Sequence, residues 1–227
     1  MKHIQIDKLS ENTYNKIISK SFNRLPNTNH KDGKYRLRRY SVIELRTTHW
    51  NGEEQATIER LPQRTFVQNN NLNNFQGNVV RKFEEIEEDV LQNEGFKEIC
   101  LAFRHSYNFT DGQELEVHQL RVVVLDNEFP DGTPVAPEGV HRDGFDYIAM
   151  IGINRNNISG GELMVYESKD GKPMIKTELK NGQIIMLNDK EFFHYASVIN
   201  RVDKSKKEGH GDWFIICAKN DVDLKAG

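Results

Sequence analysis

Short apolar runs separated by turn-forming residues fill the second half of this chain, and they constrain its fold most. Each run has the length of a strand, and together they span residues 98–104, 115–125, 147–153, 161–167, 174–179, 183–188, 193–199 and 213–219. Turn sequences such as Lys169-Asp170-Gly171 lie between them, with no helical pattern intervening. This order predicts an α+β protein with a double-stranded β-helix core, a jelly-roll or cupin-like arrangement.

Two segments before this region have helical periodicity. Ser10 is a candidate N-cap for a helix with the apolar residues Tyr14, Ile17, Ile18 and Phe22. Residues 78–92 carry a second apolar stripe, with an acidic cluster on the opposite side. Between the two, residues 35–45 have the pattern of a strand. We expect both helices to pack outside the β-helix.

Length and composition narrow the class of protein. A chain of 227 residues suffices for one domain, and we predict a single domain over residues 1–227, with 1–97 supporting a core formed by 98–220. The net charge of −3 gives no bulk attraction to nucleic acid or to anionic membranes. No apolar run reaches the roughly 20 residues of a membrane span, and the N-terminus lacks the features of a signal peptide. Cys100 and Cys217 lie in apolar runs, as buried thiols of a cytoplasmic protein do.

Two short segments suggest a metal site. His141-Arg142-Asp143 precedes one apolar run, and His194 lies in another. Residues two apart on an extended chain point to the same side, so His141 and Asp143 can reach one metal ion. Two imidazoles and a carboxylate on one face of the ion are the ligand set of non-heme Fe(II) oxygenases. The alternative is that these are ordinary polar residues at strand ends.

The order of the motifs resembles the bacterial family of small Fe(II)/2-oxoglutarate dioxygenases that includes isoleucine dioxygenase, a free-amino-acid hydroxylase. The resemblance covers most of the chain, and its motifs lie at residues 35–40, 66–68, 77–81, 116–121, 141–146, 154–155, 160–162, 187–189 and 194. It implies iron held by His141, Asp143 and His194, O₂ as oxidant, and oxidative decarboxylation of 2-oxoglutarate to succinate and CO₂. An aspartate at position 143 favours hydroxylation over halogenation, since a smaller residue would leave room for a halide.

The chain departs from this family at the residue that holds the far carboxylate of 2-oxoglutarate. The family usually has an Arg before an Asp on the last core strand, whereas this chain has Gly211 before Asp212. A carboxylate enclosed in the barrel needs a cation. Arg201 follows His194 closely, and Arg121 shares a strand face with Gln119. We expect Arg201 or Arg121 to supply the charge, with Gln119 beside Arg121; the alternatives are a different co-substrate or a shifted alignment at Gly211.

Several charged residues are candidates for binding the substrate. Arg38 belongs to a basic strand with Arg36 and Arg39, and a guanidinium grips a carboxylate with two hydrogen bonds; Arg155 is a further option. Asp146 and Glu162 are candidates for a substrate amine or for orienting an iron-bound imidazole. His118 lies on the strand face opposite Gln119 and is interpreted as a structural histidine.

Together with the resemblance, which implies 2-oxoglutarate and a free L-amino acid, these residues lead us to expect an iron- and 2-oxoglutarate-dependent hydroxylase of a small substrate. Two alternatives stay open. The enzyme could act on a peptide or protein side chain, or the chain could be a non-catalytic β-barrel binding module with vestigial ligands. Neither a nucleic acid nor a membrane is expected as a partner.

Overall fold

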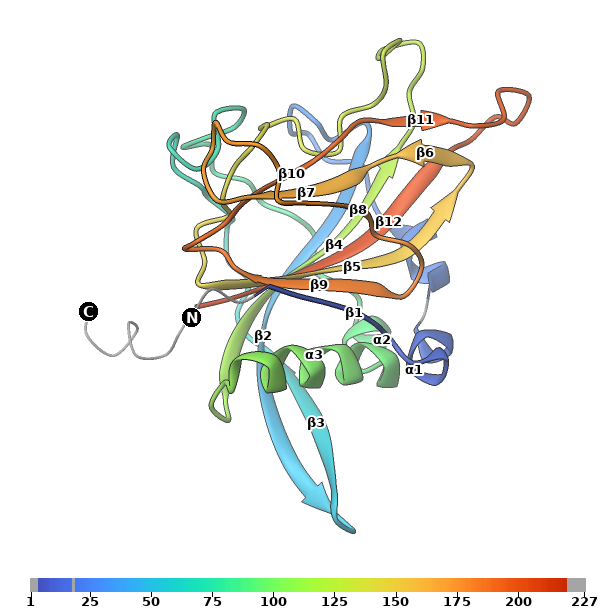
Figure 1. Cartoon of the computed structure of the whole chain (residues 1–227). Helices are drawn as coiled ribbons and strands as arrows, with labels where there is room; N and C mark the ends of the chain where they lie inside the picture. The colour runs from blue at the N-terminus through green and yellow to red at the C-terminus, as the bar shows by residue number, and fades with distance from the viewer. Residues whose placement is uncertain (1–3, 18, 220–227) are drawn as a thin grey trace.

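The computed structural model describes residues 4–17 and 19–219, in which one large β-sheet faces two small ones and the helices cover the outer face of the large sheet (Figure 1). The large sheet is antiparallel, in the order β1-β9-β5-β12-β4-β2-β3. Its strands are β1 (Ile4–Lys8), β2 (Arg36–Trp50), β3 (Glu53–Arg60), β4 (Gln113–Val123), β5 (Tyr147–Asn156), β9 (Gln183–Asn188) and β12 (His210–Ala218). It therefore draws strands from both halves of the chain.

The opposite side consists of shorter strands. They form a three-stranded sheet of β10 (Phe193–Ala196), β7 (Glu162–Tyr166) and β8 (Ile175–Glu178), and a pair of β11 (Ile199–Arg201) and β6 (Ile158–Gly160). Isolated bridges from Thr133 to Ile199 and from His141 to His194 tie the segment 133–143 to this side. Two facing antiparallel sheets with helices outside confirm the double-stranded β-helix.

Strand β12 lies between β5 and β4 at the centre of the large sheet, and both of its faces are covered. Phe214 and Ile216 pack against the helices, whereas Trp213 and Cys217 face the smaller sheets. This alternation follows from the two-residue period of a strand. The inward face of β12 therefore forms one wall of the space between the sheets.

The segment 98–104, predicted as a strand, belongs instead to helix α3 (Glu94–Tyr107). Its buried residues Phe96, Ile99, Cys100 and Phe103 recur at intervals of three and four, the period of a helix face. Asn93 caps the helix by accepting a hydrogen bond from the N–H of Phe96 at 3.1 Å. The prediction was wrong because it relied on the high apolar content of this short segment and did not use the helical spacing of its apolar residues.

The helix predicted over residues 78–92 is wrong for most of its length, because only α2 (Glu88–Leu91) is helical. The residues before it run alongside β2, where the N–H of Tyr40 donates to the carbonyl of Glu84 at 3.0 Å. Ion pairs also hold the acidic cluster there, including Arg39 with Glu84 at 2.9 Å and Arg60 with Glu85 at 3.5 Å. Tertiary pairing thus overrides the helical periodicity.

The N-terminal helix forms as two shorter pieces, α1 (Glu11–Lys16) and the 3-10 helix η1 (Ser19–Arg24). Ser10 caps α1 as predicted, accepting a hydrogen bond from the N–H of Thr13 at 3.0 Å. Ile18, part of the predicted stripe, lies outside the described residues.

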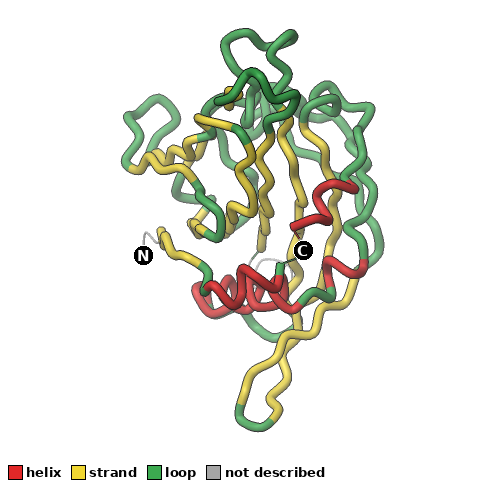
Figure 2. The backbone as a smooth tube through the Cα atoms, turned by 90° about the vertical axis from the view of Figure 1, so that its right-hand side faces the viewer, coloured by secondary structure: helices red, strands yellow, loops and turns green. Residues whose placement is uncertain are grey.

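The hairpin of β2 and β3 extends beyond the rest of the molecule in both views (Figures 1 and 2). None of the helices in the described part of the chain is long and apolar enough to cross a membrane.

Candidate active site

A cavity between the two sheets contains the predicted metal ligands. Its volume is about 90 Å³, well above the roughly 10–15 Å³ that one buried water needs. Besides the ligands, its polar lining is Arg36, Arg38, Gln68, Arg81, His118 and Glu138. Its apolar lining from β5, β7 and β12 includes Met150, Leu163, Trp213 and Ile215. The cavity thus has a charged side at β2 and an apolar side formed by β12 and β5 farther along the same sheet and by β7.

Backbone pairing brings the two histidines together. The N–H of His141 donates to the carbonyl of His194 at 3.0 Å, and the N–H of His194 donates back at 2.8 Å. After Asp143 the chain turns at Gly144, whose φ of +90° is a conformation that side chains rarely adopt. A Cβ on Gly144 would also lie 2.5 Å from Leu72 Cδ1. The turn therefore requires glycine.

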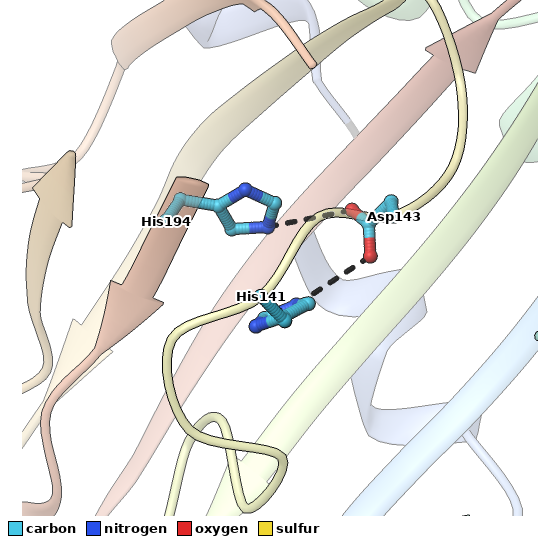
Figure 3. Close-up of side chains that lie close together, drawn as sticks. All are labelled: His141, Asp143 and His194. Atoms are coloured by element: carbon cyan, nitrogen blue, oxygen red, sulfur yellow. Dashed lines mark ion pairs between the residues drawn. The ribbon is translucent and has the colours of Figure 1, made fainter. Parts of the chain in front are cut away.

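Figure 3 shows the three side chains converging, with both imidazole rings directed at the carboxylate. Asp143 Oδ1 lies 3.5 Å from His141 Nε2, and Asp143 Oδ2 lies 3.5 Å from His194 Nε2. One donor atom from each residue lies within 4.8 Å of the others. Ligand atoms about 2.1 Å from a first-row metal ion are about 3 Å apart in neighbouring positions. The spacing and the donor types both fit a divalent transition metal.

The charges around these ligands favour a bound cation. Burial raises the pKa of Asp143, but the two histidines outweigh it and hold that pKa well below its usual range. Burial lowers the pKa of His141, yet the charges of Glu138 and Asp143 raise it to about 9. His141 Nδ1 donates to the carbonyl of Gly139 at 2.8 Å, which leaves Nε2 for a metal.

Asp189 holds the turn between the first two ligands in place. Its buried carboxylate accepts hydrogen bonds from the N–H groups of Asp143, Gly144 and Phe145 at 2.8–3.1 Å. It also lies 3.7 Å from His194 Nδ1. Burial and then the charge of Asp143 raise the pKa of Asp189. One carboxylate thus supports ligands from two separate segments.

A second polar chain supports Asp143 from the opposite side. Gln68 Nε2 donates to Asp143 Oδ1 at 3.3 Å, and Gln68 Oε1 accepts from Arg81 at 2.9 Å and from Asn73 at 3.0 Å. Arg81 is therefore linked to Asp143 by hydrogen bonds through Gln68, and the charge of Asp143 also acts on it directly.

Two further arginines from β2 face the cavity, and they differ in their partners. Arg36 forms an ion pair with Asp32 at 2.8 Å and lies 3.6 Å from Glu138. Arg38 has no ion pair or hydrogen bond among the described residues, and its guanidinium carbon lies 5.2 Å from the centroid of the Phe83 ring. Burial, followed by the charge of Arg36, lowers the pKa of Arg38 to about 9.

His118 faces the cavity, which corrects its interpretation as a satisfied structural histidine. Its Nδ1 is buried without a hydrogen-bond partner among the described residues. Burial and then Arg38 lower its pKa well below the usual value, so the ring is neutral. It lies in register with Tyr40, two residues from Arg38 on the neighbouring strand.

The residues expected to hold the far carboxylate of 2-oxoglutarate lie outside the cavity. Gln119 and Arg121 occupy the other face of β4, where Gln119 donates to Ser21 Oγ at 2.8 Å and Arg121 contacts Asp212. Arg201 on β11 forms an ion pair with Asp126. The expectation therefore does not agree with the structure, because β4 turns His118 inward and Arg121 outward.

The other candidates for substrate binding also have partners elsewhere, apart from Arg38. Asp146 lies 2.6 Å from Lys190, and Glu162 lies 3.0 Å from Lys176. Arg155 donates to the carbonyl of Gly160 at 2.6 Å and lies behind the cavity wall. Asp146, Glu162 and Arg155 do not line the cavity.

Arg121 makes a structural ion pair, and its removal is expected to lower stability. Its Nε and Nη2 contact the two oxygens of the fully buried Asp212 at 2.6 and 2.8 Å. Arg121→Met leaves that carboxylate unpaired, which costs about 3–5 kcal/mol of unfolding free energy. Urea unfolding measures this loss, with Arg201→Met as the control at a more exposed pair. A weaker affinity for 2-oxoglutarate at unchanged stability would contradict this role.

Sequence reasoning missed Gln68, Arg81, Glu138 and Asp189 as site residues. Gln68 and Arg81 lie in segments without regular structure, and their approach to the site depends on a long-range bridge between Phe66 and Arg81. Asp189 carried a usable signal, because an aspartate directly after the buried strand β9 needs a hydrogen-bonding partner.

The comparison with protein families identifies the class. The family described as 2OG-Fe dioxygenase matches residues 19–217, and this chain belongs to that family. The family uses Fe(II), 2-oxoglutarate and O₂, and the residues present fit the iron. His141, Asp143 and His194 would hold it, and the bound iron would supply the oxidising chemistry. No curated protein matches the sequence.

Solved structures support the fold. A BsmA homolog from Methylobium petroleophilum PM1 has a TM-score of 0.69 at 22% identity, covering 92% of this chain and 81% of its own. IDO from Bacillus thuringiensis has a TM-score of 0.67 at 16% identity, covering 93% and 92%. A prolyl-4-hydroxylase from Pseudomonas putida has a TM-score of 0.51 at 10% identity, covering 97% and 94%. At these identities the likeness concerns the fold alone.

Proposed function

We propose that this enzyme hydroxylates a C–H bond of a free L-amino acid, as isoleucine dioxygenase does, and releases succinate and CO₂. His141, Asp143 and His194 hold the iron in this proposal. The whole chain acts as one dioxygenase domain, with residues 1–97 supporting the core. The free, buried thiols of Cys100 and Cys217 accord with a cytoplasmic location.

The observation that carries the proposal is the unpaired guanidinium of Arg38 beside the metal ligands. A buried cation without an anion is unfavourable, so this position favours a ligand with a carboxylate. His118 lies diagonally across from it and has a free ring nitrogen. A small acid bound there would satisfy both groups.

Glu138 supplies the same cavity with a negative charge, which can pair with the amino group of an amino-acid substrate. It is 9% exposed, and its Oε1 lies 3.4 Å from His141 Nε2. Burial raises its pKa, but Arg36 and then His141 hold the pKa below its usual range, so the side chain is charged. A cation and an anion in one enclosed space are complementary to a zwitterion.

Screening free amino acids tests the substrate class. The enzyme is incubated with Fe(II), 2-oxoglutarate and one amino acid at a time, and succinate release and a mass gain of one oxygen atom are measured together. Short peptides in the same screen test hydroxylation of a peptide side chain. Turnover of peptides alone would overturn the proposal, and anaerobic Fe(II) without any spectral response to 2-oxoglutarate would indicate a non-catalytic module.

Replacing Arg38 by Met is expected to raise the KM for the amino acid by about 10- to 100-fold, the value of a charge-assisted hydrogen bond. Iron affinity should stay unchanged, because Arg38 is not a ligand. Steady-state kinetics measure the effect on the substrate found in the screen, with Arg201→Met as the control outside the cavity. An unchanged KM would remove Arg38 from the substrate site.

A further inference from the structure

The far carboxylate of 2-oxoglutarate needs a cation other than those predicted. Arg121 and Arg201 have partners outside the cavity. The apolar side of the cavity, with Met150, Leu163 and Trp213, offers no charge of its own. A carboxylate placed there requires a donor from behind the wall.

Arg155 lies behind that wall, on β5. Its Nη2 donates to the carbonyl of Gly160 at 2.6 Å and lies 3.4 Å from Glu178 Oε1. Its Nη1 is buried and has no hydrogen-bond partner among the described residues. A buried N–H group without a partner is rare and points to a missing acceptor.

The free nitrogen is next to the cavity because Gly161 has no side chain. Gly161 lines the cavity, and a Cβ built on it would lie 3.4 Å from Arg155 Nη1 and 4.0 Å from Trp213 Cζ2. Ile199 Cγ2 would lie 2.9 Å from the same Cβ. The guanidinium therefore lies directly behind Gly161, between Ile199 and the edge of Trp213.

The register of the sheet explains why the cation is on β5. Gly211 on β12 pairs directly with Arg155. A Cβ on Gly211 would lie 2.0 Å from Cη2 of Trp213, so the indole ring fills the space that a side chain at 211 would need. An arginine therefore does not fit at position 211, and its cross-strand neighbour is free to replace it.

We propose that Arg155 binds the distal carboxylate of 2-oxoglutarate through Nη1, with Gly161 and Gly211 leaving the space and Trp213 forming the side wall. Arg38, on the other side of the cavity, then remains for the substrate. This assignment rests on the family's use of 2-oxoglutarate and is independent of which substrate the enzyme hydroxylates.

Ligand binding to the enzyme loaded with Mn(II) in place of iron tests the assignment without turnover. Calorimetry compares 2-oxoglutarate with 2-oxovalerate, which has the same five carbons but no distal carboxylate. Arg155→Met is expected to raise the Kd of 2-oxoglutarate by about 10- to 100-fold, the value of a charge-assisted hydrogen bond. The Kd of 2-oxovalerate should not change.

Two further variants, Glu178→Gln and Arg38→Met, are measured in the same binding experiment. Glu178→Gln removes the carboxylate that competes for Arg155 at a half-exposed position, and it should tighten 2-oxoglutarate binding by about 2- to 5-fold, the value of such an ion pair. This variant keeps the test valid even if Arg155→Met does not fold. Arg38→Met is the matched control inside the cavity and should leave the Kd of 2-oxoglutarate unchanged.

Equal 2-oxoglutarate affinity in wild type, Arg155→Met and Glu178→Gln would overturn the assignment, as would a selective loss in Arg38→Met. A wild-type Mn(II) enzyme that bound no 2-oxoglutarate would also overturn the assignment. Failure of the amino-acid proposal would appear separately, in the substrate screen.

Discussion

Replacing His194 by Ala is expected to abolish iron binding and turnover while the fold is retained. The substitution removes one of only three protein ligands, and the remaining imidazole and carboxylate hold a divalent ion weakly. The backbone hydrogen bonds between residues 194 and 141 do not involve the side chain, so β10 keeps its pairing. Calorimetry with Mn(II) measures the loss of metal binding, and thermal unfolding of the metal-free protein checks the fold.

The matched control is His105→Ala, since His105 lies on α3, is 56% exposed and pairs with Glu54 away from the cavity. This variant should bind metal and turn over like the wild type. The visible charge-transfer band of the anaerobic Fe(II)–2-oxoglutarate complex gives a second measurement. A His194→Ala enzyme that retained the band and full activity would show that the metal site is elsewhere.

The second large effect is expected for Asp189→Ala, which leaves three N–H groups of residues 143–145 without their acceptor. Each unsatisfied buried donor costs about 1–3 kcal/mol, so the free energy of unfolding should fall by several kcal/mol. The turn that carries Asp143 loses its anchor, and metal affinity should fall by about 10- to 100-fold, as for other residues that orient metal ligands. Denaturant unfolding and metal titration measure the two effects.

Two controls distinguish a loss of metal affinity caused by misplacement of Asp143 from one caused by lower stability of the whole protein. Asp189→Asn keeps one acceptor oxygen and should be intermediate in both measurements. Asp111→Ala removes a surface carboxylate that accepts from the N–H of Thr47 at 2.6 Å, and it should leave metal affinity unchanged and lower stability far less than Asp189→Ala does. Wild-type metal affinity in Asp189→Ala would mean that the carboxylate only stabilises the turn.

The approach of His141 and Asp143 could be predicted from sequence because its signal is local. A histidine and an aspartate two residues apart on extended chain share a side whatever the surrounding fold. The alternation of turns and apolar runs likewise specified most core strands. Helix α3 was the exception, since a short apolar run fits a buried strand as well as a helix.

The charged side of the site could not be predicted in the same way. Residues 117–120 of β4 are buried on both faces, so polarity does not show which face lines the cavity. On the outward face, Gln119 and Arg121 form hydrogen bonds with Ser21 and Asn23. Those partners lie about a hundred positions earlier in the chain, and a strand pattern contains no information about them.

The backbone bridge between His141 and His194 has a consequence for how the metal is acquired. The protein aligns its two imidazoles by main-chain hydrogen bonds made during folding, so an arriving ion orders little of the chain. Small metallodomains behave differently, since they gain their structure only with the ion. We therefore expect chelation and folding to be separate events in this protein, so that the metal can leave and return while the barrel stays formed.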